Sequence, residues 1–123
     1  MTRYSETVMD HFQDPRNQGK LDHPDLIGVA GVPGCGRYVI LQLALSESRD
    51  RVIAARFQSH GCGSTIASAS MLTELVTGMA LTLCRDLSAE DLLTALGGLP
   101  ADKMNCAEFA IVALQHALTP LSF

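Results

Sequence analysis

The stretch RYVILQLAL occupies residues 37–45, and RVIAARFQSH follows it at residues 51–60 after the polar segment SESRD. Alternate positions of the first stretch are apolar: Val39, Leu41, Leu43 and Leu45. This period of two predicts a strand that buries one face. The apolar run LIGV at residues 26–29 predicts an earlier strand. Because short polar turns join antiparallel neighbours, the sequence favours a small antiparallel sheet of about three strands.

The stretch at residues 51–60 predicts a strand with the same alternation. We place Ile53, Ala55 and Phe57 on one of its faces. Arg56 and Gln58 then lie on the opposite face, because successive side chains of a strand point in opposite directions. This strand pairs with the preceding one across the polar turn.

Helical periodicity dominates the chain after residue 60. Apolar residues recur there at intervals of three and four: Ile66, Ala69, Leu72 and Val76, then Ala107, Ala110, Ile111, Leu114 and Leu118. Ser88 and Asn105 predict helix N-caps, and Gly97 predicts a helix end. Tyr4, Val8 and Phe12 form a further helical stripe near the beginning. Strands first and helices later are typical of an α+β sandwich, in which helices cover one small sheet.

Length and charge limit the class of protein. With 123 residues, 47% of them hydrophobic, the chain can form a real core, and we expect a single domain over residues 1–123. The formal net charge of −4 argues against a nucleic-acid binder, because such proteins carry a basic excess. No apolar run reaches the roughly 20 residues of a membrane span, and the first residues lack the apolar middle of a signal peptide. We therefore expect a cytoplasmic protein without a nucleic-acid or membrane partner.

Three of the four cysteines lie where a thiolate is favoured. Cys35 and Cys62 are each flanked by glycines, which allow close approach of the backbone to a bound group. Cys62 and Cys106 lie at predicted helix starts, where the helix dipole stabilises a thiolate. No CxxC pair is present, so we expect these three cysteines to converge in space rather than form a ribbon-type zinc site. Cys84 lacks both features, and we assign it to the core.

The cysteines stand among other short motifs that follow one another along essentially the whole chain. They are Tyr4-Ser5-Glu6, Asp10-His11, Pro15-Arg16-Asn17, Gly19, Cys35-Gly36, Gly61-Cys62-Gly63-Ser64, Ile66-Ala67-Ser68, Leu99-Pro100, Lys103 and Cys106. In their order and distances they resemble the iron–sulfur cluster assembly scaffold proteins of the IscU and NifU N-terminal family. The resemblance implies the α+β fold of that family, the SufE/NifU sandwich.

The resemblance also implies a function as a scaffold and carrier rather than as an enzyme. A transient [2Fe–2S] cluster would be built from iron and sulfur on Cys35, Cys62 and Cys106, with Lys103 near the site. A cysteine desulfurase would supply the sulfur, and the cluster would pass to apo iron–sulfur proteins. Zinc is a candidate for the cluster-free site. A [4Fe–4S] cluster remains an alternative, and both a monomer and a homodimer remain open.

Three departures from the family pattern affect these expectations. Arg37 replaces an acidic residue two positions after the first cysteine, and Asn105 replaces a histidine before the third. The fourth ligand is therefore open between His60, a small molecule, water and a side chain of a partner. If Arg37 faces the site, its charge would stabilise thiolates and an anionic cluster. Because the segment at residues 101–103 reads ADK, without a second proline or an apolar residue, we do not expect docking of an Hsp70-type chaperone.

Two other functions remain open on the residues alone. Three thiolates with one nitrogen or oxygen ligand also suit Zn²⁺, so a zinc-binding persulfide acceptor in sulfur trafficking is the alternative. An enzyme with a cysteine nucleophile would need a base beside the sulfur, and the sequence holds no cysteine–histidine motif of that kind. We interpret His11 as a solvent-facing or capping side chain.

Overall fold

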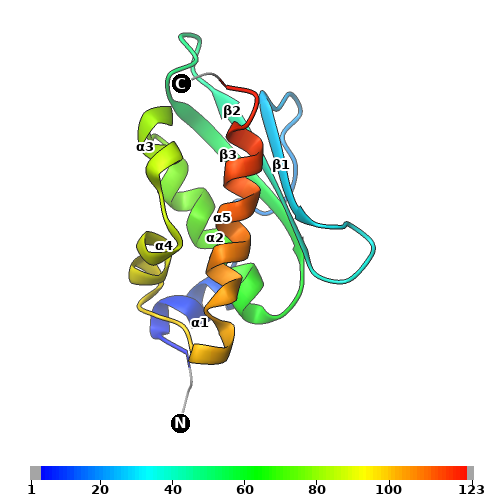
Figure 1. Cartoon of the computed structure of the whole chain (residues 1–123), viewed down its shortest axis with the longest axis vertical. Coiled ribbons are helices and arrows are strands. Elements are labelled where there is room, and N and C mark those ends of the chain that lie inside the picture. The colour runs from blue at the N-terminus through cyan, green and yellow to red at the C-terminus, as the bar shows by residue number, and fades with distance from the viewer. Residues whose placement is uncertain (1–3, 122–123) are drawn as a thin grey trace.

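The computed structural model describes residues 4–121, which form a three-stranded sheet and the helices that pack on it (Figure 1). In chain order the elements are α1 Glu6–Gln13, β1 Leu26–Gly31, β2 Tyr38–Leu45, β3 Val52–His60, α2 Gly63–Val76, α3 Leu81–Asp86, α4 Ala89–Leu96, the 3₁₀ turn η1 Ala101–Lys103 and α5 Asn105–Leu118. The strand order is β1-β2-β3 with both pairings antiparallel, so the predicted α+β architecture is confirmed. None of the helices in this described part is long and apolar enough to cross a membrane.

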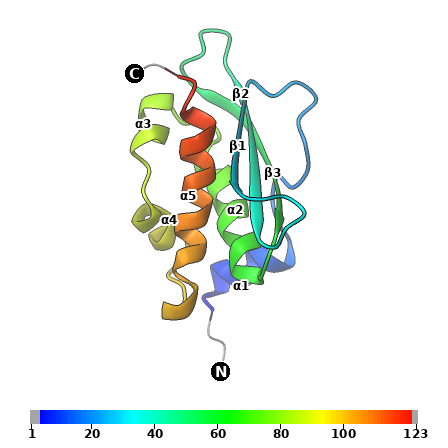
Figure 2. The ribbon, with the colours of Figure 1, turned by 45° about the vertical axis from the view of Figure 1, so that its right-hand side comes forward.

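The core lies between the sheet and two long helices. The inward side chains of β2 are buried as the alternation predicts: Val39, Leu41, Leu43 and Leu45. Phe57 of β3 is fully buried beside them. Helices α2 and α5 lie next to each other on this face of the sheet (Figure 2). Because burial of one such side chain stabilises the fold by about 1.5–3 kcal/mol, this apolar face accounts for the position of both helices.

The beginning of β3 differs from the sequence prediction. Val52, Ala55 and Phe57 are fully buried whereas Ile53 is 57% exposed, so the prediction that Ile53 shares a face with Ala55 and Phe57 is wrong. Ala44 pairs with Ala54, but the next residue, Leu45, pairs with Val52, and this shift leaves Ile53 without a partner in the ladder. A β-bulge of this kind places two residues opposite one and changes the face on which the neighbouring side chains lie.

The helix ends are set by local capping. Ser88 begins α4 with a capping box, in which its hydroxyl accepts from the N–H of Asp91 and the Asp91 carboxylate accepts from the N–H of Ser88. Gly97 ends this helix in the left-handed region, at φ 77°. Both predictions are confirmed. Asn105 does not cap α5, because Met104 before it already has helical angles and Asn105 is the first helical residue.

Helix α5 packs very closely on β1, and Gly28 makes this possible. A Cβ at Gly28 would lie 1.9 Å from the carbonyl oxygen of Ala113 and 2.5 Å from the backbone nitrogen of Ala117. The next residue, Val29, donates its N–H to Nδ1 of His116 over 2.9 Å. The edge strand is therefore held on the helix by direct backbone contact and by a side-chain hydrogen bond.

Candidate functional site

Two cysteines meet where α2 and α5 begin, at the same end of the molecule (Figure 2). Cys62 is the N-cap of α2, and Cys106 is the second residue of α5. Their Sγ atoms are 4.0 Å apart. Cys62 is exposed whereas Cys106 is only 2% exposed. The two helix starts thus bring a solvent-facing thiol into contact with a buried one.

Thr65, in the first turn of α2, contacts both thiols of the pair. Its hydroxyl lies 3.8 Å from Sγ of Cys62 and donates to Sγ of Cys106 over 3.6 Å. Burial raises the pKa of Cys62, but the N–H and hydroxyl of Thr65, the N–H of Ser64 and the Cys106 thiol outweigh burial and lower this pKa to about 7. At neutral pH, Cys62 is therefore divided between thiol and thiolate.

Cys106 has the opposite tendency. Burial raises the pKa of Cys106, the Thr65 hydroxyl lowers it, the neighbouring Cys62 raises it, and the charge of Arg37 lowers it, with burial dominant. The thiolate form of the pair therefore has its charge on Cys62, while Cys106 keeps its proton. A metal ion or cluster that binds both sulfurs displaces that proton, since the thiolate is the metal ligand.

Arg37 lies directly beside this cysteine pair. Its Nη1 is 4.0 Å from Sγ of Cys106, and its guanidinium carbon is 4.1 Å from the centre of the Phe109 ring, in a cation–π contact. The residue belongs to the exposed connection between β1 and β2, and its tip reaches back to the start of α5. The structure thus places a positive charge at the buried sulfur.

Cys35 lies apart from the pair. It is exposed on the loop between β1 and β2, where its N–H donates to the carbonyl of Val32. Over residues 4–121, no group of three or more His, Cys, Asp or Glu side chains is close enough to hold a metal ion. The structure therefore assembles two of the predicted ligands, and the role of Cys35 as the third stays a prediction.

The other residues singled out near the site lie close to the cysteines along the chain. His60 is the last residue of β3, and its exposed ring stacks on Tyr38 with 6.1 Å between ring centres. Lys103 ends the turn η1, three positions before Cys106, and Asn105 directly precedes that cysteine. The part of His60 as a ligand stays a prediction.

Cys84 occupies the core, as predicted. It lies on α3 and is only 1% exposed. Burial raises its pKa to about 11, so the thiol is protonated and unreactive at neutral pH. This cysteine provides a natural comparison for the other three.

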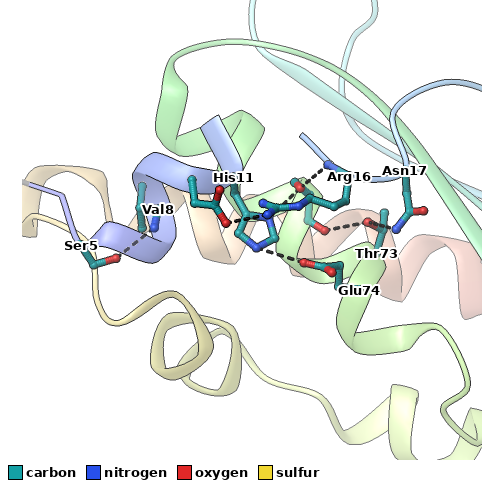
Figure 3. A network of polar contacts seen from close by, with 9 residues as sticks. Ser5, Val8, His11, Arg16, Asn17, Thr73 and Glu74 are labelled. Carbon is teal, nitrogen blue, oxygen red and sulfur yellow. Dashed lines mark hydrogen bonds and ion pairs between the residues drawn. The ribbon is translucent and has the colours of Figure 1, made fainter. Parts of the chain in front are cut away.

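A polar network joins α1 to α2, and its centre is His11 (Figure 3). The interpretation of His11 as solvent-facing is wrong, because the residue is 4% exposed. Its Nδ1 lies 2.7 Å from the hydroxyl of Ser70, and its Nε2 lies 3.0 Å from the Glu74 carboxylate. Ser70 in turn accepts the N–H of Arg16 over 2.9 Å. These bonds hold α1 on the helix that begins at Cys62.

The contact of Thr65 and the burial of His11 could have been predicted from their positions in the sequence. Thr65 stands three positions after Cys62, which is the spacing at which a side chain reaches back to an N-cap residue. His11 stands three positions after Val8 and seven after Tyr4, so it shares the apolar stripe of its helix. A polar residue on such a stripe indicates a buried hydrogen bond.

Comparison with known proteins supports one family. The profile of the NifU-like N terminal domain matches residues 3–121. The iron-sulfur cluster assembly scaffold protein IscU 1 of Archaeoglobus fulgidus is 42% identical over 119 residues, covering 94% of this chain and 74% of that protein. The corresponding scaffold protein IscU of Aquifex aeolicus is 37% identical over 115 residues, covering 94% of this chain and 73% of the relative.

Solved structures share the fold. A Fervidobacterium islandicum protein, described as an iron-sulfur cluster assembly scaffold for the SUF system, aligns with a TM-score of 0.71 at 22% identity. The alignment covers 94% of this chain and 96% of the other. At this identity the likeness concerns the arrangement of the sheet and helices alone.

Proposed function

The chain belongs to the family of NifU-like N-terminal domains, and we propose that it is a scaffold on which iron–sulfur clusters are assembled and from which they are passed on. The observation that carries the proposal is the sulfur pair of Cys62 and Cys106 at the starts of two helices. Protein-bound iron–sulfur clusters are held by cysteine thiolates. Here one sulfur ionises near neutral pH, and its partner is in contact with it.

The proposed ligands of a transient [2Fe–2S] cluster are Cys35, Cys62 and Cys106. The loop of Cys35 supports its part, because Gly34 and Gly36 on either side adopt φ near +85° and have open space where a Cβ would lie. Iron and sulfide can therefore approach the exposed sulfur from solvent. For the fourth position, His60, water, a small molecule and a partner's side chain remain candidates.

The scaffold acts as a carrier that releases its cargo, and turnover of a substrate is not part of this proposal. It requires a sulfur donor, for which we propose a cysteine desulfurase, and apo iron–sulfur proteins as acceptors. We place these exchanges in the cytoplasm. The exposure of Cys62 and Cys35 supports direct transfer between proteins, since both sulfurs are open to solvent.

Single substitutions to serine test the ligand set. Each of Cys35→Ser, Cys62→Ser and Cys106→Ser is reconstituted anaerobically with iron and sulfide, and the visible absorption and the iron and sulfide content per chain are measured. Each variant is expected to lose most of the bound cluster. Cys84→Ser is the matched control and is expected to keep it, because that thiol is buried in the core away from the pair.

Two results would contradict the proposal. A Cys84→Ser protein that loses its colour while Cys35→Ser keeps it would overturn the ligand assignment. A wild-type protein that stays colourless after reconstitution and instead retains zinc at one ion per chain would favour the zinc-binding alternative.

A further inference from the structure

Arg37 sits in a cradle built from segments far apart in the sequence. Its guanidinium lies over the ring of Phe109 from α5. That ring in turn occupies the space left by Gly31, where a Cβ would lie 2.9 Å from Cζ of Phe109. The stem of Arg37 passes Gly61, where a Cβ would lie 3.2 Å from Cγ of Arg37. Two glycines and one aromatic ring thus direct the guanidinium to the cysteine pair.

Within the described residues 4–121, no ion pair neutralises the charge of Arg37. None of the carboxylates within residues 4–121 forms a salt bridge with it, whereas Arg16 and Arg49 pair with Asp10 and Asp25. Arg37 contacts the side chain of Cys106, with 4.0 Å between Nη1 and Sγ. The residue is also exposed, so it is accessible to a cargo from solvent.

A guanidinium has five N–H donors and no acceptor, and it remains charged at all physiological pH values. It cannot complete the coordination of a metal ion, because a ligand needs a free lone pair. It can donate hydrogen bonds to sulfur. An iron–sulfur cluster brings inorganic sulfides that accept such bonds, whereas a lone Zn²⁺ brings no acceptor of its own.

We propose that Arg37 is a specificity-determining residue of the cysteine site, which favours a cargo that contains its own sulfide over a lone divalent metal ion. The proposal rests on the scaffold function proposed above. Arg37 donates hydrogen bonds to the sulfurs of the cluster and places a positive charge beside it. An oxidised [2Fe–2S] core and a lone Zn²⁺ are both dications on the same thiolates, so the charge of Arg37 acts alike on both. The hydrogen bonds to inorganic sulfide are what distinguish the two cargoes.

Arg37→Gln tests the proposal, with Arg51→Gln as the matched control. Arg51 is exposed at the beginning of β3, whereas the cysteine site follows the other end of that strand. We expect Arg37→Gln to lose its cluster about tenfold faster than wild type in the presence of an iron chelator, the lower end of the loss seen when an outer hydrogen-bond partner of a metal site is removed. Its zinc affinity, measured by chelator competition on the cluster-free protein, should change far less.

The reduction potential of the bound cluster provides a second readout, which a merely structural role would not move. A positive charge and hydrogen bonds to sulfur favour the more negative, reduced cluster and raise its potential. The potential of Arg37→Gln should therefore be more negative than that of wild type and of Arg51→Gln. Arg37→Lys keeps the charge and should restore most of the wild-type potential.

Equal rates of cluster loss in wild type and Arg37→Gln would overturn the inference. So would a fall in zinc affinity as large as the fall in cluster retention, or an unchanged potential. Failure of the scaffold function itself would look different, because the wild-type protein would then take up no cluster at all. Far-ultraviolet circular dichroism of each variant confirms that the fold is retained.

Discussion

At the scale of single residues, burial and Thr65 together shift the pKa values of the two thiols in opposite directions. The N–H of Thr65 favours the Cys62 thiolate, its single hydroxyl proton contacts Cys62 or Cys106, and burial dominates at Cys106. The result is an exposed cysteine whose pKa is about 7 next to a buried one whose pKa is raised. A nucleophilic thiolate and a protonated thiol are thereby kept 4.0 Å apart.

Alkylation should report this difference. We expect the rate of reaction of Cys62 with iodoacetamide to reach half its maximum near pH 7, because the thiolate is the reacting form and its pKa is about 7. Cys84 should stay unmodified in the folded protein throughout this range, since its pKa is about 11 and it is buried. Peptide mass spectrometry follows each cysteine separately.

Thr65 variants separate the hydroxyl from the backbone contribution. Thr65→Val removes the hydroxyl and should move the midpoint for Cys62 to higher pH, whereas Thr65→Ser keeps the hydroxyl and serves as the control. Identical midpoints in the two variants would show that the hydroxyl has no part in lowering the pKa.

At the scale of elements, the position of α1 depends on a neutral histidine. Neutral His11 can donate from Nε2 to Glu74 and accept at Nδ1 from the hydroxyl of Ser70, which leaves Ser70 free to accept the N–H of Arg16. Protonation at Nδ1 would turn this acceptor into a donor. Burial lowers the pKa of His11, with a further lowering by Arg16, against the raising effects of Glu74 and Asp10. The network and the pKa therefore favour the same, uncharged form.

This predicts a loss of stability in acid. Because the pKa of His11 is lower in the folded protein than its ordinary value of 6.5, the unfolded chain binds the proton first as the pH falls. The His11 contribution is thus present above pH 6.5 and is lost as the pH falls through the folded pKa. Urea midpoints of wild type should decrease more between pH 7 and pH 5 than those of His11→Gln.

His23→Gln is the control for this measurement, since His23 is exposed on the loop after α1. It should retain the wild-type pH dependence. If His11→Gln and wild type lose stability in parallel over this range, His11 does not take up its proton on unfolding and the explanation fails.

The contact between β1 and α5 leads to another prediction at this scale. Gly28→Ala places a methyl group 1.9 Å from the carbonyl oxygen of Ala113, so strand and helix must move apart. We expect a loss of about 2 kcal/mol or more in the free energy of unfolding, typical of overpacking at a site that cannot give way. Chemical denaturation measures it.

Ile27→Val, at the half-exposed neighbouring position, is the control and should stay within about 0.5 kcal/mol of wild type. A Gly28→Ala protein as stable as this control would mean that α5 can shift away from the strand without cost.

At the scale of the whole molecule, the sequence predicts those features that depend on neighbouring residues in the chain, and it does not predict those that depend on contacts between distant segments. The burial of β2 follows from its own alternation, and the end of α4 at Gly97 follows from local backbone preference. The exposure of Ile53 depends on a bulge that exists only in the pairing with β2. The burial of His11 is indicated by the apolar stripe of its helix, but its partners on α2 and in the loop after α1 are specified by no local pattern.

The features of the candidate site also separate into those with local causes and those that depend on distant contacts. Glycine flanking and helix starts indicated Cys62 and Cys106, and the structure places these two in contact. The contact of Arg37 with Cys106 and Phe109 joins residues 69 or more positions apart, so it follows from the packing of α5 against the end of the sheet. Sequence spacing alone contains no information on that packing.

A prediction at this scale concerns the segment between α4 and α5. The exposed residues Ala101 and Asp102 follow Pro100 where a chaperone groove would require apolar side chains, and burial of a carboxylate without a partner is costly. We expect no measurable complex with an Hsp70-type chaperone in calorimetry. The double variant Ala101→Pro, Asp102→Val should gain binding, whereas micromolar binding by the wild type would contradict the prediction.

The hydrogen bond between Val29 and His116 spans 87 residues of chain, and it has a consequence for biosynthesis. At about 5–20 residues per second, the ribosome needs about 4–17 s to make the chain between these two residues. During that interval β1 has been synthesised but the helix that covers it is incomplete. Cys106 is incorporated near the end of the same interval. A nascent chain therefore cannot form the pair of Cys62 and Cys106 until α5 emerges. On the proposed ligand set, a cluster would be loaded only after α5 has emerged.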